Sequence, residues 1–229
     1  MTAHDGERRR DRILTAAERL FSEAGIDGVS MREIAAEAGV QLALISYYFG
    51  TKQELYRAVF RRRIEPVSEE RLAMLQRILE RKNPPPAIED VLDALARPWV
   101  ELRDTRGGLL YTRLIAREVS DLRESKRGIV KEMLDPVARR FIAAMEKVLP
   151  DLPRSEIHWG YHFFIGALLL LLMSTDRTQR LSGPLCDMSK SQKVIDEIVG
   201  FFSRALKTAA AERRSASGRK AKSAKGKRR

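Results

Sequence analysis

The chain has 229 residues, of which 44% are hydrophobic and 32% charged, so it is long enough to bury a core and polar enough to fold in water. Its single cysteine, Cys186, excludes an internal disulfide and gives no sign of an oxidising compartment. The amino terminus is charged and lacks the apolar segment of a signal peptide. We therefore expect a cytoplasmic protein.

The formal net charge of +12 suggests nucleic-acid binding, but the charge is unevenly distributed. Residues 212–229 carry nine Lys or Arg against one Glu, whereas residues 1–52 carry seven basic and eight acidic side chains. The tail cannot bury enough apolar surface to offset the entropy of ordering it. We predict that residues 211–229 form a disordered basic tail and that residues 1–7 are a disordered amino terminus.

Helical spacing of apolar residues begins at residue 8 and is interrupted by turn and capping residues. Ser30 with Glu33, and Thr51 with Glu54, have the spacing of capping boxes, in which each residue of the pair satisfies a backbone N–H. The expected helices cover residues 8–24, Ser30 to a break at residues 38–40, residues 41–48, and a longer segment from Thr51 onward.

The rest of the chain also has helical patterns, and no stretch shows the alternation of a strand. Pro66 is expected to end or kink the fourth helix near Arg63. Further helices are expected over residues 87–104, 108–120, 122–148, 153–173 and 189–208. The predicted fold class is all-α.

Three residues have the spacing of a helix-turn-helix: Ala35 is small where two helices touch, Gly39 lies in the turn, and Ile45 fills the angle between the helices. An ordinary tight helical hairpin uses the same common residues. The caps on both sides favour the DNA-reading unit. Residues 8–52 are therefore predicted to be a helix-turn-helix DNA-binding domain whose third helix enters the major groove of double-stranded DNA.

With Ile45 buried, the outward face of the third helix is small, apolar and phenolic. The methyl groups of Leu42 and Ala43 suit a thymine methyl, and hydroxyls such as that of Tyr47 bind phosphate oxygens. The helix starts at Ser30, Gln41 and Thr51 offer backbone N–H groups to phosphates. Lys52 adds one charge, and Arg32 and Gln41 are the candidates for contacts with base edges. The alternative for Tyr47 and Tyr48 is a place in the core.

Residues 12–60 resemble the TetR family of transcriptional regulators, through the segments ILTAAERLFSEAGIDGVSMREIAAEAGV and ISYYFGTKQELYRAV. The resemblance implies an N-terminal three-helix DNA-binding domain and, over residues 53–210, a C-terminal helical ligand-binding and dimerisation domain. It implies DNA contacts from Ser30, Arg32, Gln41, Leu42, Ala43, Ser46, Tyr47, Tyr48 and Lys52.

Two residues depart from the family pattern. Leu44 stands where the family usually has Thr or Ser, and Ser46 stands where it usually has Tyr. The form LALISYYFGTK resembles a subgroup that responds to fatty acids or acyl-CoA. The expected effector is a small hydrophobic or anionic molecule, such as an acyl-CoA, and no cofactor is expected.

Residues 157–175 carry no formal charge and approach the length that spans a bilayer. Only residues 163–173 are densely apolar, so we favour a helix that is covered by protein and expect no membrane partner. The family resemblance implies a homodimer through the helices around residues 154–173 and 189–207.

The ligand pocket is expected among the fourth to eighth helices. Arg113 and Arg117 lie one helical turn apart and can hold a carboxylate or phosphate. The alternative for these arginines is pairing with Asp104 or Glu118, or exposure to solvent. The alternative for the large residues is an ordinary position in the core. The candidates are Trp99, Arg103, Tyr111, Arg113, Leu114, Arg117, Phe141, Met145 and Tyr161.

His158 and His162 are four residues apart, a spacing that can bind zinc, but no glutamate lies between them and no cysteine is nearby. We predict no metal site. The chain has no nucleophile elbow, phosphate loop or dinucleotide-binding glycine pattern, so it is not expected to be an enzyme.

These features predict a ligand-responsive transcriptional regulator, a repressor, that binds a near-palindromic operator as a homodimer and is released or modulated by its effector. The alternative is a protein that coats DNA without sequence preference through its basic tail.

Overall fold

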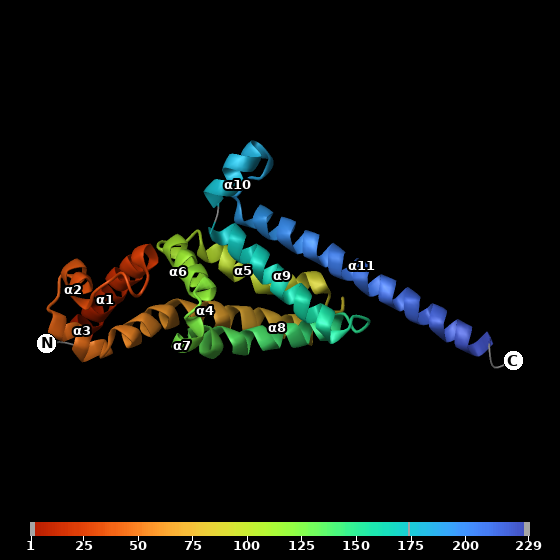
Figure 1. Ribbon diagram of the computed structural model, residues 1–229, viewed down its shortest axis with the longest axis horizontal. Helices are drawn as coiled ribbons and strands as arrows, with labels where there is room; N and C mark the ends of the chain where they lie inside the picture. Colours follow the sequence, from red (N-terminus) through yellow and green to blue (C-terminus); the bar gives the residue numbers. More distant parts are fainter. Residues whose placement is uncertain (1–2, 174, 227–229) are drawn as a thin grey trace. The chain divides into compact units, whose positions relative to one another are not determined.

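The computed structural model describes residues 3–173 and 175–226. All regular elements in these residues are helices, as predicted (Figure 1). They are α1 (Ala3–Ala24), α2 (Met31–Ala38), α3 (Leu42–Phe49), α4 (Lys52–Glu80), α5 (Ile88–Leu102), α6 (Gly108–Ser120), α7 (Glu124–Arg127), the π-helix η1 (Val130–Leu134), α8 (Asp135–Val148), α9 (Arg154–Met173), α10 (Thr175–Ser182), the 3-10 helix η2 (Gly183–Leu185) and α11 (Ser191–Gly226).

The chain forms two compact units. The first contains Met1–Glu69 and Leu102–Pro136, and the second contains Glu70–Glu101 and Val137–Arg229. Helix α4 continues through Pro66, so of the two expectations for this proline, an end or a kink near Arg63, the end is wrong and the kink stays a prediction. The first unit therefore contains half of α4 together with α6 and α7, and it is larger than the predicted domain of residues 8–52.

Helices α1 and α11 extend beyond their expected ends. Helix α1 begins at Ala3, with Asp5 in its first turn, where a negative charge interacts favourably with the helix dipole. Helix α11 continues to Gly226 through a segment rich in Ala, Lys and Arg, which are strong helix formers. The described parts of residues 1–7 and 211–229 have helical backbone, and the rest of both segments lies outside the described residues; their disorder stays a prediction.

The single helix expected over residues 122–148 is interrupted. Gly128 ends α7 in a left-handed conformation, with φ of +68°, which glycine adopts without strain. Pro136 lies in the first turn of α8, where its missing N–H has no helical partner to lose. The chain therefore turns between α7 and α8 where the sequence pattern predicted a continuous helix.

A row of aromatic rings forms the core of the first unit. Phe21 of α1 packs edge-on against Tyr56 of α4 with ring centroids 4.9 Å apart, and Tyr56 packs against Phe60 at 4.9 Å. Phe60 then contacts Tyr111 of α6 at 6.2 Å. All four side chains are buried, so α1, α4 and α6 share one apolar core.

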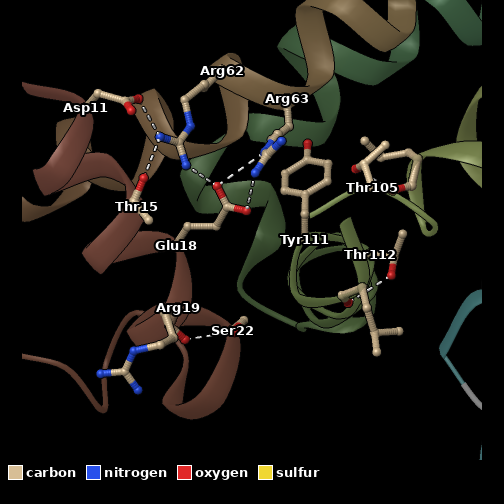
Figure 2. Close-up of polar contacts among 12 residues, drawn as sticks. Asp11, Thr15, Glu18, Arg19, Ser22, Arg62, Arg63, Thr105, Tyr111 and Thr112 are labelled. Carbon is tan, nitrogen blue, oxygen red and sulfur yellow. Dashed lines mark hydrogen bonds and ion pairs between the residues drawn. The ribbon is translucent and has the colours of Figure 1, made fainter. Parts of the chain in front are cut away.

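A buried carboxylate adds a polar link between α1 and α4. Glu18 is 3% exposed and accepts hydrogen bonds from Arg62 and from Nη2 of Arg63, the latter at 3.1 Å (Figure 2). Arg62 also donates to Oδ1 of Asp11 at 2.9 Å. Burial and the charge of Glu18 raise the pKa of the Tyr111 hydroxyl well above its usual value. Glu18 thus attaches the middle of α1 to the first half of α4.

A second buried carboxylate links α4 to α6 and α7. Glu118 is 1% exposed and accepts from the Tyr56 hydroxyl at 3.0 Å and from Nε of Arg127 at 2.9 Å. Burial, followed by the charge of Glu118, raises the pKa of Tyr56 above its usual value. The first half of α4 is therefore tied to α1 on one side and to α6 and α7 on the other.

In the second unit, α9 lies beside α11 (Figure 1). The rings of Phe164 and Phe202 pack edge-on with centroids 5.2 Å apart, and Val194, Ile195 and Ile198 are buried. Helix α9 is long and apolar enough, by length and composition, to cross a membrane, yet only 33% of its most apolar window is buried here. One such helix is weak evidence for a membrane span, since helices of water-soluble proteins meet the same criterion.

We predict that Glu18→Ala lowers the free energy of unfolding by about 2–3 kcal/mol, because it removes a buried carboxylate that accepts charged hydrogen bonds from the half-buried Arg62 and Arg63. Urea unfolding of the full chain measures this change. The matched control is Glu23→Ala on the same helix, whose carboxylate is 54% exposed and pairs with Arg19. That change should be at most about 1 kcal/mol. Equal losses for the two variants would contradict the role given to Glu18.

Candidate nucleic-acid interface

Helix α2 begins with a complete capping box. The N–H of Glu33 donates to Oγ of Ser30 at 3.2 Å, and the N–H of Ser30 donates to Oε2 of Glu33 at 2.6 Å. The hydrogen bond from the Ser30 backbone holds the pKa of Glu33 below its usual value. The predicted start of this helix is confirmed, but the N–H of Ser30 itself is engaged and is not open to a phosphate.

The turn between α2 and α3 is held from two directions. Gly39 has φ of +60°, a left-handed conformation that ends α2, and the N–H of Val40 bonds to the Ala35 carbonyl at 3.0 Å. Arg12 of α1 donates through Nη2 to the carbonyl oxygens of Ala38 at 2.5 Å and Gly39 at 3.0 Å. Arg12 thereby fixes the turn to α1, a role that the sequence did not suggest.

Helix α3 buries one side and exposes the other, as expected. Ile45 is 0% exposed and Phe49 is 7% exposed, whereas Tyr47 is 79% exposed and Leu42 is 38% exposed. Ala43 and Ser46 are also exposed. The outward face therefore carries methyl groups and hydroxyls and no cation.

Two polar side chains near this face are available for contacts. Gln41 is the N-cap residue of α3, and its side chain makes no capping hydrogen bond. Arg32 is exposed on α2 and forms no ion pair with the residues that the structure describes. The start of α3 has no acidic residue in its first turn, so its backbone N–H groups have no carboxylate beside them.

Tyr48 has a structural contact of its own. Its ring is half-buried and lies edge-on to that of Tyr47, with centroids 5.4 Å apart. Its hydroxyl donates to the carbonyl oxygen of Gly6 at 3.3 Å. Tyr48 therefore supports the first turns of α1, while the ring of Tyr47 faces solvent.

Lys52 lies at the start of α4 and reaches back to α2. Its Nζ donates to the carbonyl oxygen of Val29 at 3.0 Å, next to Ser30. The start of α4 carries the second capping box, in which the N–H of Thr51 donates to Oε2 of Glu54 at 2.8 Å. This bond holds the pKa of Glu54 below its usual value. Of the three helix starts expected to bind phosphates, that of α3 is the one without a carboxylate in its first turn.

The candidate pocket residues are divided between the two units. Trp99, Phe141, Met145 and Tyr161 belong to the second unit, and the other candidates belong to the first. Tyr111 and Leu114 are fully buried in the core of the first unit, and Arg103 pairs with Asp104 at 3.5 Å.

Arg113 and Arg117 are both exposed. Arg117 donates through Nη2 to the carbonyl oxygen of Glu23 at 3.2 Å, close to Gly25 at the end of α1. A hollow of about 740 Å³ in the first unit is lined by residues that include Glu18, Arg62 and Arg106, but by none of the pocket candidates. Anion binding by Arg113 and Arg117 stays a prediction.

His158 and His162 are exposed on α9. Among the residues that the structure describes, no three His, Cys, Asp or Glu side chains form a group that could hold a metal ion.

The residues that the sequence did not identify act over long distances in the chain. Arg12 reaches carbonyl groups 26 and 27 residues away, and Glu18 pairs with arginines 44 and 45 residues away. A partial indication that Glu18 is buried was present in the sequence, because this residue follows Ala17 on the apolar face of α1. Nothing in the sequence indicated the role of Arg12.

Two family models match the chain. "Bacterial regulatory proteins, tetR family" covers residues 13–59, and "Tetracyclin repressor-like, C-terminal domain" covers residues 93–204. The transcriptional dual regulator CecR of Shigella flexneri is 27% identical over 175 residues, which are 72% of this chain and 75% of CecR. The transcriptional regulator PksA of Bacillus subtilis is 45% identical over 51 residues, 22% of this chain and 25% of PksA.

Solved structures share the fold. The fatty acid degradation regulator FadR from Bacillus halodurans aligns with a TM-score of 0.59 and 16% identity, over 85% of this chain and 94% of FadR. A complex of SmeT with triclosan aligns with a TM-score of 0.54 and 18% identity, over 83% of this chain and 89% of SmeT. With both family models matched in order along one chain, the protein belongs to the TetR family of transcriptional regulators, which bind DNA and are not enzymes.

Proposed function

We propose that this protein is a ligand-responsive repressor that acts in the cytoplasm and binds a near-palindromic operator as a homodimer. The observation that carries the proposal is the outward face of α3, which leaves Tyr47 79% exposed beside an N-terminus without a carboxylate. The ring of Tyr47 packs against that of Tyr48, but most of the side chain is exposed, and its hydroxyl suits a phosphate oxygen. Four further side chains expected to contact DNA are exposed on α2 and at the start of α3: Arg32, Gln41, Leu42 and Ala43.

Not every predicted contact has equal support. Lys52 donates to Val29, and an ammonium group has three donors, so two are left for a phosphate beside the start of α2. The Ser30 hydroxyl already accepts the capping hydrogen bond of α2, and the Tyr48 hydroxyl already donates to α1. We assign base reading to Arg32 and Gln41, with methyl contacts from Leu42 and Ala43.

An exposed apolar stripe on α9 supports the homodimer. Four apolar side chains of α9 are exposed and lie on one face at helical spacing: Trp159 (62%), Phe163 (61%), Leu170 (56%) and Met173 (42%). The rings of Trp159 and Phe163 stack, with centroids 5.5 Å apart. Phe201 of the neighbouring helix α11 is 64% exposed. An apolar surface of this kind on a DNA-binding regulator marks a protein interface, and two-fold pairing through α9 and α11 covers it in both copies.

Response to a ligand is supported by the matched C-terminal family model and by relatives. SmeT was solved with triclosan, and the name of FadR refers to fatty acid degradation. We expect a small hydrophobic or anionic effector in the second unit. A ligand that changes the direction of α4 moves the DNA-reading helices with it, because Glu18 and Glu118 tie α4 to α1 and α6. Release requires that the ligand prefers the conformer that does not bind DNA, typically by about 1–3 kcal/mol.

Replacing Tyr47 with Phe tests the role of the recognition face. Tyr47→Phe should weaken operator binding roughly fivefold, which corresponds to the loss of one hydrogen bond of about 1 kcal/mol. The thermal midpoint should not change, since the side chain is 79% exposed. Fluorescence anisotropy with a duplex selected from a random pool measures the affinity. Unchanged affinity would remove Tyr47 from the interface.

Deleting residues 212–229 separates the repressor from a protein that coats DNA. The deletion removes nine Lys and Arg, so the dependence of log K on log salt should become shallower. The preference for the selected duplex over a scrambled one should remain, because a basic tail neutralises phosphates and does not read bases. Loss of that preference, or its absence in the full chain, would favour the coating protein.

Charge on the apolar stripe should separate the two protomers. Phe163→Asp buries a carboxylate in the proposed interface and should give a monomer in sedimentation equilibrium, with weaker operator binding. The control is Leu181→Asp on α10, at a residue that is 73% exposed outside the stripe, and it should stay dimeric. A dimer in both variants would place the interface elsewhere.

A further inference from the structure

Arg71 is a buried cation in the second unit. It lies in the second half of α4 and is 4% exposed. Its Cζ is 5.7 Å from the centroid of the Trp99 ring and 5.0 Å from that of Phe141. Tyr161 also acts on it electrostatically. The guanidinium thus contacts aromatic rings of α5 and α8 and interacts electrostatically with Tyr161 of α9.

The group is charged near neutral pH. Burial lowers the pKa of Arg71 to about 10, which is still well above the pH of the cell. Contacts with ring faces stabilise a cation, but a ring face does not replace the oxygen acceptors that a guanidinium N–H group usually bonds.

Arg71 lacks a carboxylate partner. Its Nε is buried without a hydrogen-bond acceptor, and no ion pair joins the side chain to the residues that the structure describes. The arginines of the first unit differ in this respect, since Arg62 and Arg63 pair with Glu18 and Arg127 pairs with Glu118. A buried cation without an anion is unfavourable, so an anion from outside the chain would find a prepared partner here.

The side chains near Arg71 indicate the chemical character of the rest of such a molecule. Phe141 and Met145 are 0% exposed and offer only apolar surface. Trp99 and Tyr161 are 7% and 8% exposed, so the cluster approaches solvent at these two side chains. Two of the residues expected from sequence to line the pocket, Trp99 and Phe141, therefore contact Arg71, and a third, Tyr161, interacts with it electrostatically; Arg71 itself was not among the candidates.

We propose that Arg71 is the anion-binding residue of the effector site and that the effector is an apolar carboxylic acid. The guanidinium holds the carboxylate through two parallel N–H···O bonds, and the aromatic side chains contact the apolar body. The proposal rests on the proposed function, in that it places the effector in the second unit. It replaces Arg113 and Arg117 by Arg71 as the group that recognises charge.

The test compares carboxylates with their neutral amides. The probes are decanoate and 4-phenylbutanoate, each with its primary amide, and the readouts are calorimetric affinity and the thermal midpoint of the full chain. At least one carboxylate should bind and raise the midpoint, and its amide should bind on the order of tenfold or more weakly, because the amide cannot form the charged pair. Equal effects of acid and amide, or no binding by any probe, would overturn the proposal.

Variants of Arg71 locate the site. Arg71→Met should abolish the difference between acid and amide and, without ligand, should have a thermal midpoint equal to or above that of the wild type, since it removes an unpaired buried charge. Arg71→Lys keeps a cation without the planar fork and should bind the carboxylate several-fold more weakly, a readout that serves if the Met variant fails to fold. Arg77→Met, at an exposed residue of the same helix, is the matched control and should bind as the wild type does. Unchanged carboxylate affinity in both Arg71 variants would assign the residue a structural role.

Operator binding distinguishes the two proposals. Arg71→Met should bind the selected duplex as tightly as the wild type but should not be released by the carboxylate. If the wild type binds no duplex selectively while its carboxylate binding depends on Arg71, the repressor function fails and the anion site stands. If the wild type binds its operator selectively and the carboxylate releases both proteins equally, the anion site fails and the repressor function stands.

Discussion

The buried carboxylate of Glu18 holds α1 against the first half of α4, and the positions of the other DNA-facing helices follow from that link. Arg12, on the same α1, holds the turn between α2 and α3, and Tyr48 of α3 in turn supports the start of α1. Glu118 extends the link to α6 and α7. The exposed face of α3 is therefore part of a body that includes half of α4, so a change in the direction of α4 has to move the reading face as well.

The features predicted correctly from sequence are local ones. The capping boxes at Ser30 and Thr51 and the turn at Gly39 depend on residues within a few positions of each other, and the structure contains all of them. The burial of Ile45 and the exposure of Tyr47 follow from helical periodicity alone. Local pattern was also enough to propose the outward face of the recognition helix.

The features that sequence did not predict depend on distant partners or on competition between helix and turn. The pairing of Glu18 with two arginines joins segments more than forty residues apart, and no pattern encodes it. The break at Gly128 lies in a segment whose apolar spacing suits a continuous helix, so one left-handed glycine decided the outcome. The aromatic candidates Trp99 and Phe141 were identified, but the cation that they surround was not, because Arg71 looks like a surface residue of a long charged helix.

We propose that DNA is held by the start of α3, which has no carboxylate in its first turn, and by its hydroxyl face, with Lys52 beside it, and that the basic tail only adds attraction. Hydrogen–deuterium exchange of the full chain with a selected operator duplex tests it most directly. The first N–H groups of a helix have no partner within the helix and exchange quickly unless a ligand binds them. We expect exchange to slow at Leu42 and Ala43, whose N–H groups lack a partner within the helix, when the protein binds the selected duplex and not when it is mixed with a scrambled one; the N–H of Leu44 already bonds to the Gln41 carbonyl and serves as the internal control. Slowing confined to residues 212–226, with α3 unchanged, would contradict it.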